Sequence, residues 1–341
     1  MVGDEDKTGK NFILLNFNRV YKVKFNNRTS NSLKKLTDEF NRLPKFKEGT
    51  KSNRGEGFLD FEDDFKINFV MKHSWKSRDQ TCKELEDMNF EKDISNKNIV
   101  TKIFRYEDYT KGKQDPQLTE ADLFWIKPYD ILLIRGGKKT CELISEKYLV
   151  KFTNAGFEQI KFTPEFLLWM CFKYESEGKL SDDLIFQKMD KSRTQGIGTN
   201  ENDIIVREGQ GRMIPIPTIY GLLNDQELFH VGGDFNFREE YTLNVKLAKD
   251  LSIFIYSEHE LKGKSYDKKC SLSFPFILEL IGVFEEWNAK DDDDDDKYPD
   301  DDFFNSSIDS FRTQVEYSIE CLNKLKEKYN KLRSNGVADG P

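Results

Sequence analysis

Short apolar runs rich in β-branched and aromatic residues, separated by Gly, Asn and Asp, follow one another between residues 196 and 256. Such runs, with turn-forming residues between them, are typical of strands in an antiparallel meander. The pattern predicts strands at residues 203–206, 212–217, 227–231, 240–247 and 251–256. We expect the core of the protein to be built around these strands.

Alternating apolar and polar positions also predict strands in the N-terminal part of the chain. In residues 11–25, Val20, Lys22 and Lys24 share one side of the expected strand, and Tyr21 lies on the other. This predicts an N-terminal strand with one partly basic, solvent-facing side. The same pattern predicts a strand or hairpin at residues 58–72, with Phe65, Ile67, Phe69 and Met71 on one side, and strands at 98–106 and 131–134.

Apolar spacings of three and four residues, together with capping residues, predict the helices. The run Thr163-Pro164-Glu165 combines an N-cap threonine, a first-position proline and an acid near the positive end of the helix dipole. We therefore expect a buried helix from this point to about residue 174. Further helices are expected at residues 32–43, capped by Ser30 or Asn31, and at 81–88, 140–150, 181–192 and 274–287, with a helical turn at 118–123.

The C-terminal region combines an acidic run with an amphipathic one. Residues 291–296 are all Asp, and residues 300–302 are Asp as well. Like charges at this density do not condense into a core, so we expect an extended or disordered tether. Beyond it, apolar residues at spacings of three and four predict a long helix that packs on the body, on its twin in a dimer, or on another protein: Ile308, Phe311, Val315, Leu322, Leu325, Tyr329 and Leu332.

Together these elements predict an α+β protein with several parts. The expected division is a mixed, basic N-terminal subdomain at residues 1–138 and a helical plus antiparallel-meander subdomain at 139–289. An acidic linker at 290–302 and a C-terminal amphipathic helix at 303–341 complete it. The boundary near residue 138 follows the glycines that end the strand at 131–134.

Composition narrows the class of protein. The chain has 341 residues, of which 37% are hydrophobic and 33% charged, as expected for a globular protein with a sizeable core. No stretch is long and apolar enough to cross a bilayer, and residues 1–10 are polar, so we expect a cytoplasmic protein without membrane contact. The scattered cysteines Cys82, Cys141, Cys171, Cys270 and Cys321 predict reduced, mostly buried thiols rather than a disulfide framework or zinc site.

Charge is unevenly distributed along the chain. Residues 7–54 contain thirteen Lys and Arg against three acidic residues, although the whole chain has a net charge of −8. Cations interleaved with aromatic residues are typical of surfaces that neutralise phosphates and stack on bases. The expected nucleic-acid contacts are Lys22, Lys24, Arg28, Lys34, Lys35 and Tyr21, with Arg207 and Arg212 beside a Gly-containing turn. An ordinary solvated surface is the alternative.

The strongest pattern for catalysis lies at residues 196–206, where a Gly-rich turn delivers Asp203 to the start of an apolar strand. Metal-dependent nucleases place one carboxylate on Mg²⁺ in this way. The next expected strand lacks the second acid and the lysine of such a site, which leaves Glu165 and Glu240 as the remaining acids. A Gly turn followed by an Asp at the edge of a strand, without catalysis, explains the same residues. His230 and His259 show no metal-ligand spacing and are interpreted as structural histidines.

The sequence therefore supports several functional hypotheses. The first is a nucleic-acid-binding protein or subunit that contacts the phosphate backbone through its basic N-terminal region. The second is a non-catalytic interaction or assembly subunit, or homo-oligomer, that docks through residues 308–332. The third is a divalent-metal nuclease around Asp203. Outside the third hypothesis, which requires Mg²⁺, the residues call for no cofactor and favour a protein without catalytic activity.

Overall fold

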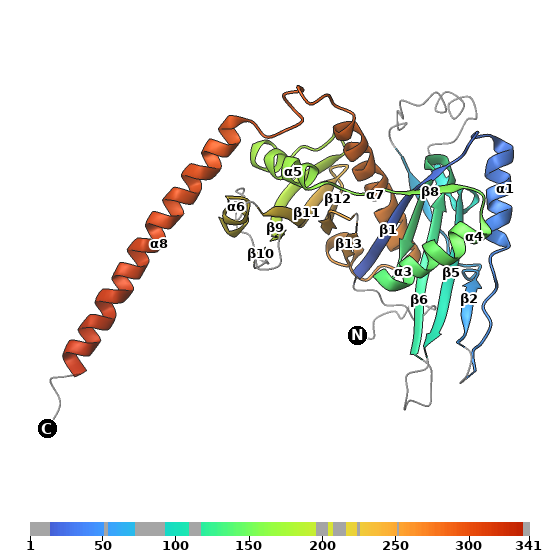
Figure 1. Ribbon diagram of the computed structural model, residues 1–341, viewed down its shortest axis with the longest axis horizontal. Helices are drawn as coiled ribbons and strands as arrows, with labels where there is room; N and C mark the ends of the chain where they lie inside the picture. Colours follow the sequence, from blue (N-terminus) through green and yellow to red (C-terminus); the bar gives the residue numbers. More distant parts are fainter. Residues whose placement is uncertain are drawn as a thin grey trace.

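The computed structural model describes residues 14–50, 54–71, 93–108, 117–195, 204–206, 216–223, 226–250 and 252–336. Within this part of the chain, helices and antiparallel strands are both abundant, so the α+β class predicted above is confirmed (Figure 1). None of the helices in these ranges is both long and apolar enough to cross a membrane. The helix expected at residues 81–88 and the Gly-rich turn at 196–203 lie outside the described residues.

A single antiparallel sheet of eleven strands connects the described parts of the chain, in the order β10-β9-β11-β12-β13-β1-β7-β6-β5-β2, with β8 paired to β1. The strands are β1 (Leu14–Lys24), β2 (Glu56–Leu59), β5 (Ile99–Asp108), β6 (Gln117–Ile126), β7 (Ile131–Arg135), β8 (Gly156–Gln159), β9 (Leu184–Gln195), β10 (Ile204–Val206), β11 (Glu227–Phe237), β12 (Tyr241–Ala248) and β13 (Ile253–Tyr256). A separate pair is formed by β3 (Asn68–Val70) and β4 (Asp93–Ser95).

Strand β1 holds the two halves of the sheet together. One edge pairs with β7, and the other pairs first with β13 and then with β8. The predicted basic N-terminal subdomain and the predicted meander therefore share one continuous sheet. A bulge between Phe17 and Arg19 shifts the register, so that Phe17 and Val20 both point into the same core.

The bulge also explains why the expected solvent-facing side of β1 is wrong. Val20 is completely buried, and the ammonium group of Lys22 lies 3.1 Å from Glu285 of the long helix α7. The side predicted to be basic and solvated is therefore packed beneath a helix at Val20 and Lys22, whereas Lys24 at its end is exposed as predicted. Val20, an apolar residue on the same side of the strand as Lys22, indicated that this side is buried, because a half-buried strand places alternate residues on one side in the core.

Helices cover the two sides of the sheet unequally. The described helices are α1 (Ser30–Asn41), α3 (Lys138–Leu143), a π-helical segment (Ile144–Leu149), α4 (Val150–Phe152), α5 (Pro164–Ser176), α6 (Ile216–Leu223), α7 (Tyr266–Asn288) and α8 (Asp301–Gly336). Residues of α5 and α7 pack on one side, in a large core that spans both halves of the sheet. Residues of α1, α3 and the π-helical segment pack on the opposite side of the β5–β6–β7 half.

Strand β7 and residues 121–126 of β6 are buried on both sides, and their sequences follow from that position. Alternate residues enter different cores: Phe124 and Leu133 lie in the α7 core, and Trp125 and Leu132 in the α1 core. Strands covered on both faces are continuous apolar runs rather than alternating ones. The helical turn expected at residues 118–123 is wrong, because these residues lie in β6.

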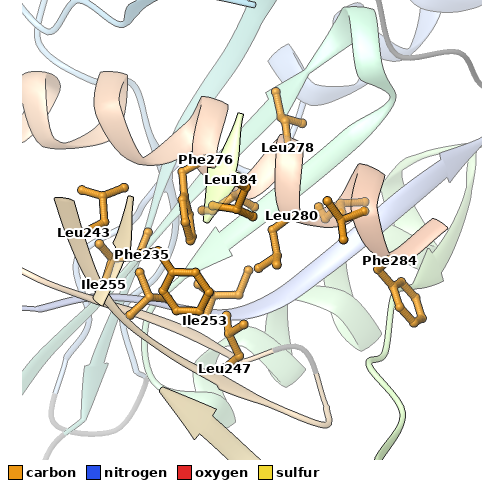
Figure 2. Packing of buried hydrophobic residues seen from close by; sticks show 14 of the residues in the cluster. Leu184, Phe235, Leu243, Leu247, Ile253, Ile255, Phe276, Leu278, Leu280 and Phe284 are labelled. Atoms are coloured by element: carbon orange, nitrogen blue, oxygen red, sulfur yellow. The ribbon is translucent and has the colours of Figure 1, made fainter. Parts of the chain in front are cut away.

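Strands β11, β12 and β13 have a core on one side only. Their inward residues, including Phe235, Leu243, Leu247, Ile253 and Ile255, face Phe276, Leu278 and Leu280 of α7 (Figure 2). The strands predicted at 227–231, 240–247 and 251–256 are confirmed in type. The helix expected at 181–192 is wrong, because β9 covers residues 184–195. The strand expected at 212–217 is contradicted at its end, where residues 216 and 217 begin α6.

The acidic segment is folded against the body rather than extended. The indole N–H groups of Trp169 and Trp287 donate to the backbone oxygens of Asp296 and Lys297, each at 2.8 Å. Lys173 and Lys290 both form ion pairs with Asp296. The prediction of a tether did not take these lysines into account, because Lys173 is far away in the sequence. Pairing with the lysines offsets the repulsion between the aspartates.

Candidate functional site

The structure places the predicted N-terminal cations in different surroundings. Lys24 forms an ion pair with Glu158 at 3.0 Å, and Arg28 forms one with Asp130 at 2.5 Å. Together with the Lys22–Glu285 pair, these contacts pair three of the five N-terminal cations predicted to bind phosphate with acids. Lys34 and Lys35 differ, since both are exposed on α1 and neither forms an ion pair with a described residue.

Two aromatic residues of this region are unavailable for stacking on bases. Tyr21 keeps only 7% of its surface exposed, and its hydroxyl donates to Ser145 at 2.7 Å. Phe17 is completely buried. The structure therefore separates part of the predicted combination: exposed cations remain on α1, whereas these two rings belong to the core, and Phe25 and Phe46 are partly exposed.

The residues proposed for a metal site are not brought together within the described part of the chain. Glu165 lies in the first turn of α5, and Glu240 is exposed in the turn between β11 and β12. Asp203, Arg207 and Arg212 lie outside the described residues. Among the residues that are described, no group of three or more His, Cys, Asp or Glu side chains is arranged to hold a metal ion.

A different group of polar and aromatic residues gathers on the outward side of the C-terminal half of the sheet, opposite the core shown in Figure 2. None of its residues belongs to either hydrophobic cluster. We call this surface the polar sheet face. It consists of Lys191 and Arg193 of β9, Phe229, His230, Gly232 and Asp234 of β11, Asn244 and Lys246 of β12, and Phe254 and Tyr256 of β13.

Strand register brings the cations of this face together. Lys191 of β9 lies opposite Gly232 of β11, which lies opposite Lys246 of β12. Neighbouring strands are about 4.8 Å apart, so the two lysines originate roughly 10 Å from each other. Arg193 lies opposite His230 in the adjacent row. The sheet thus collects positive groups from strands that are distant in the sequence.

Gly232 lies in close contact with the backbone of β12. A Cβ atom at this position would lie 2.7 Å from the backbone oxygen of Val245 and 3.0 Å from Cα of Lys246. Both contacts are with backbone atoms, which cannot rotate away as the end of a side chain can. A larger residue between Lys191 and Lys246 would therefore require the backbone of β11 or β12 to shift.

The electrostatic environment of this row is unusually positive. The ammonium group of Lys246 forms neither a hydrogen bond nor an ion pair with any described residue, and burial together with the charges of Lys191 and Arg193 lowers the pKa of Lys246. Burial, reinforced by the charges of Lys246 and Arg193, lowers the pKa of His230 to about 4. A bound anion would stabilise positive groups gathered in this way.

Aromatic rings accompany each of these cations. The ammonium group of Lys246 lies 4.1 Å from the ring centre of Phe254, and that of Lys191 lies 4.0 Å from the ring centre of Tyr256. The guanidinium of Arg193 lies 4.8 Å from the ring centre of Phe229. These three rings are partly exposed, unlike Phe17 and Tyr21. The face therefore offers positive charge and flat apolar surface side by side.

One end of the face is acidic. Asn244 is buried, donates to Asp234 at 2.7 Å and accepts from Lys191 at 2.6 Å. His259 approaches Asp234 at 3.3 Å. Asp190 lies 3.8 Å from Lys191, and its pKa is raised by burial and by the charge of Asp234. These contacts hold Lys191 in place and give the face a positive and a negative end.

Sequence analysis missed this face for a physical reason. The outward residues of β9 belonged to a segment interpreted as a helix, and β-bulges interrupt its alternation at several positions opposite β11. Lys246 and Phe254 were recognised only as parts of apolar strands. The usable signal was the alternation Lys191-Ser192-Arg193-Thr194, in which the hydroxyl residues are buried and the cations point outward. No known family model matches this chain, and no curated protein matches it either.

Proposed function

We propose that this protein binds single-stranded nucleic acid on the polar sheet face. The observation that carries the proposal is the row formed by Lys191, Gly232, Lys246 and Phe254, in which the two lysines lie on the strands on either side of Gly232 and against partly exposed rings. Lysine and arginine neutralise phosphates, and aromatic side chains stack on bases. Proteins that bind single strands without strict sequence preference combine these two features.

A single strand fits this face better than a duplex. Stacking on Phe229, Phe254 and Tyr256 requires bases whose flat surfaces are free, whereas a duplex buries them between neighbouring base pairs. Readout of a duplex generally requires an element that enters a groove, and the cations here lie on strands within the sheet rather than on a projecting helix. The acidic end at Asp190 and Asp234 repels phosphate and confines the strand to the positive end.

Titration of a fluorescent oligonucleotide with the full-length protein tests the proposal. We expect a 20-nucleotide single strand to bind about tenfold more tightly than the corresponding duplex at about 50 mM salt. Neutralisation of roughly three phosphates by Lys191, Arg193 and Lys246 predicts a log–log salt slope of about −2. No binding at low salt, or equal binding of the duplex, would contradict the proposal.

A further inference from the structure

Helix α8 presents an apolar stripe that nothing in the described structure covers for most of its length. Its first turns dock on the body, where Phe303 is buried and its ring packs against Phe172 at 5.5 Å. The rest projects away from the sheet (Figure 1). Along the stripe, 39% to 64% of the surface of each of these side chains is exposed: Ile308, Val315, Leu322, Leu325 and Tyr329.

The spacing of this stripe is that of a coiled-coil seam. With Phe311 and Ser318 included, the residues of the seam lie three or four positions apart, which places them at the two inward positions of successive heptads. A single exposed apolar residue is normal on a protein surface, but a continuous exposed seam indicates a missing partner. Among the residues that the structure describes, none packs on the exposed stripe of α8 beyond the docked turns.

Charge on α8 is sorted around the seam. The positions that flank the seam carry Arg312, Lys326 and Lys328. The other flanking positions with described side chains hold no acid: they are Asn305, Ser307, Ile319 and Cys321. The acids Asp309, Glu316, Glu320 and Glu327 lie on the side opposite the seam. Lys326 and Lys328 are exposed and form no ion pair with a described residue.

This sorting selects the kind of partner. In a coiled coil the flanking positions of one helix face those of the other, and opposite charges there determine which helices pair. Two copies of α8 would place their flanking positions against each other and bring no acid to pair with Lys326 or Lys328. A helix with acidic flanking residues would instead complement each cation.

We propose that the seam of α8 binds an amphipathic helix of another protein whose own apolar seam is flanked by Asp or Glu. The region of α8 beyond residue 311 is the docking surface, and the acids on its far side remain in water. An anionic membrane fits less well. A helix that lies on such a membrane is rich in Lys and Arg on its polar side, whereas the polar side of residues 301–331 also carries acids, which the membrane would repel.

Binding of designed peptides to the full-length protein tests this inference. The probe is a four-heptad helical peptide with an apolar seam and Glu at every flanking position, and the control has Lys at those positions. We expect the Glu peptide to bind at least about tenfold more tightly than the Lys peptide. Leu322→Ser with Leu325→Ser should abolish binding, whereas Glu320→Gln, on the opposite side of the helix, should leave it unchanged.

Several results would overturn the inference. Equal binding of the two peptides, or binding of neither, would show that the flanking cations do not select the partner. A concentration-dependent dimer in sedimentation equilibrium that is lost in the Leu322→Ser, Leu325→Ser variant would identify a second copy as the occupant. Flotation with anionic vesicles that depends on the same leucines would identify a membrane instead.

Discussion

Replacement of Arg135 by Leu is expected to lower the free energy of unfolding by about 3–5 kcal/mol, the largest single effect that we predict on stability. Asp122 is completely buried beneath α7, and its carboxylate forms an ion pair with Arg135 at 2.5 Å. The guanidinium also donates to the hydroxyl of Tyr266 at 2.8 Å. Without Arg135, a buried carboxylate loses its countercharge. Urea unfolding followed by circular dichroism measures the loss.

The same sheet provides a matched control for this prediction. Arg105 pairs with Glu120 at 2.8 Å, but both side chains are partly exposed, so Arg105→Leu should cost about 1 kcal/mol or less. Replacing Asp122 and Arg135 together by Leu should recover much of the loss, because no charge is then left buried. If Arg135→Leu were no more costly than Arg105→Leu, the buried pair would not have the structural role assigned to it.

Reversal of charge on the polar sheet face is expected to have the largest effect on nucleic-acid binding. Lys191→Glu combined with Lys246→Glu should weaken binding of a single strand by about 100-fold at low salt, because attraction to phosphate becomes repulsion on both sides of Gly232. The corresponding Gln variant should lose about tenfold and lower the salt slope. Fluorescence anisotropy measures both, and the unfolding midpoint of each variant verifies that the fold is retained.

A second pair of lysines on the same protein serves as the control. Lys34 and Lys35 are exposed on α1, and they belong to the basic N-terminal region that the sequence indicated. Lys34→Glu with Lys35→Glu changes the net charge by the same amount as the sheet variant does. We expect a loss of less than about threefold, since long-range charge alone is screened beyond about 10 Å at 0.1 M salt. A larger loss of binding than that of the sheet variant would show that the nucleic acid binds at α1 rather than on the polar sheet face.

Elements with strong local signals were predictable from the sequence. The cap formed by Thr163 and Pro164 begins α5 as expected, and Thr163 accepts from the backbone N–H of Phe166 at 3.2 Å. Phe65, Ile67, Phe69 and Met71 all lie in the core, as their alternation predicted. In each case the pattern lies within a few residues of sequence and needs no distant partner.

Features that depend on distant residues were not predictable in this way. The row that joins Lys191 to Lys246 depends on the register of β9, β11 and β12, which no local pattern specifies. The folded state of the acidic segment depends on Trp169 and Lys173 of α5. The pairing of Lys22 with Glu285 depends on α7 lying over β1. Local composition indicated the charge of the acidic segment and of Lys22 correctly, but it did not indicate which residues lie next to them.

Photocrosslinking most directly tests the claim that the polar sheet face binds a single strand. An oligonucleotide that carries a photoreactive base at successive positions is irradiated with the full-length protein, and mass spectrometry identifies the modified residues. We predict attachment at Phe229 and His230 of β11 and at Phe254 and Tyr256 of β13. We also predict that this attachment is lost in the Lys191→Glu, Lys246→Glu variant. Attachment confined to α1, with the sheet residues unmodified, would contradict the account.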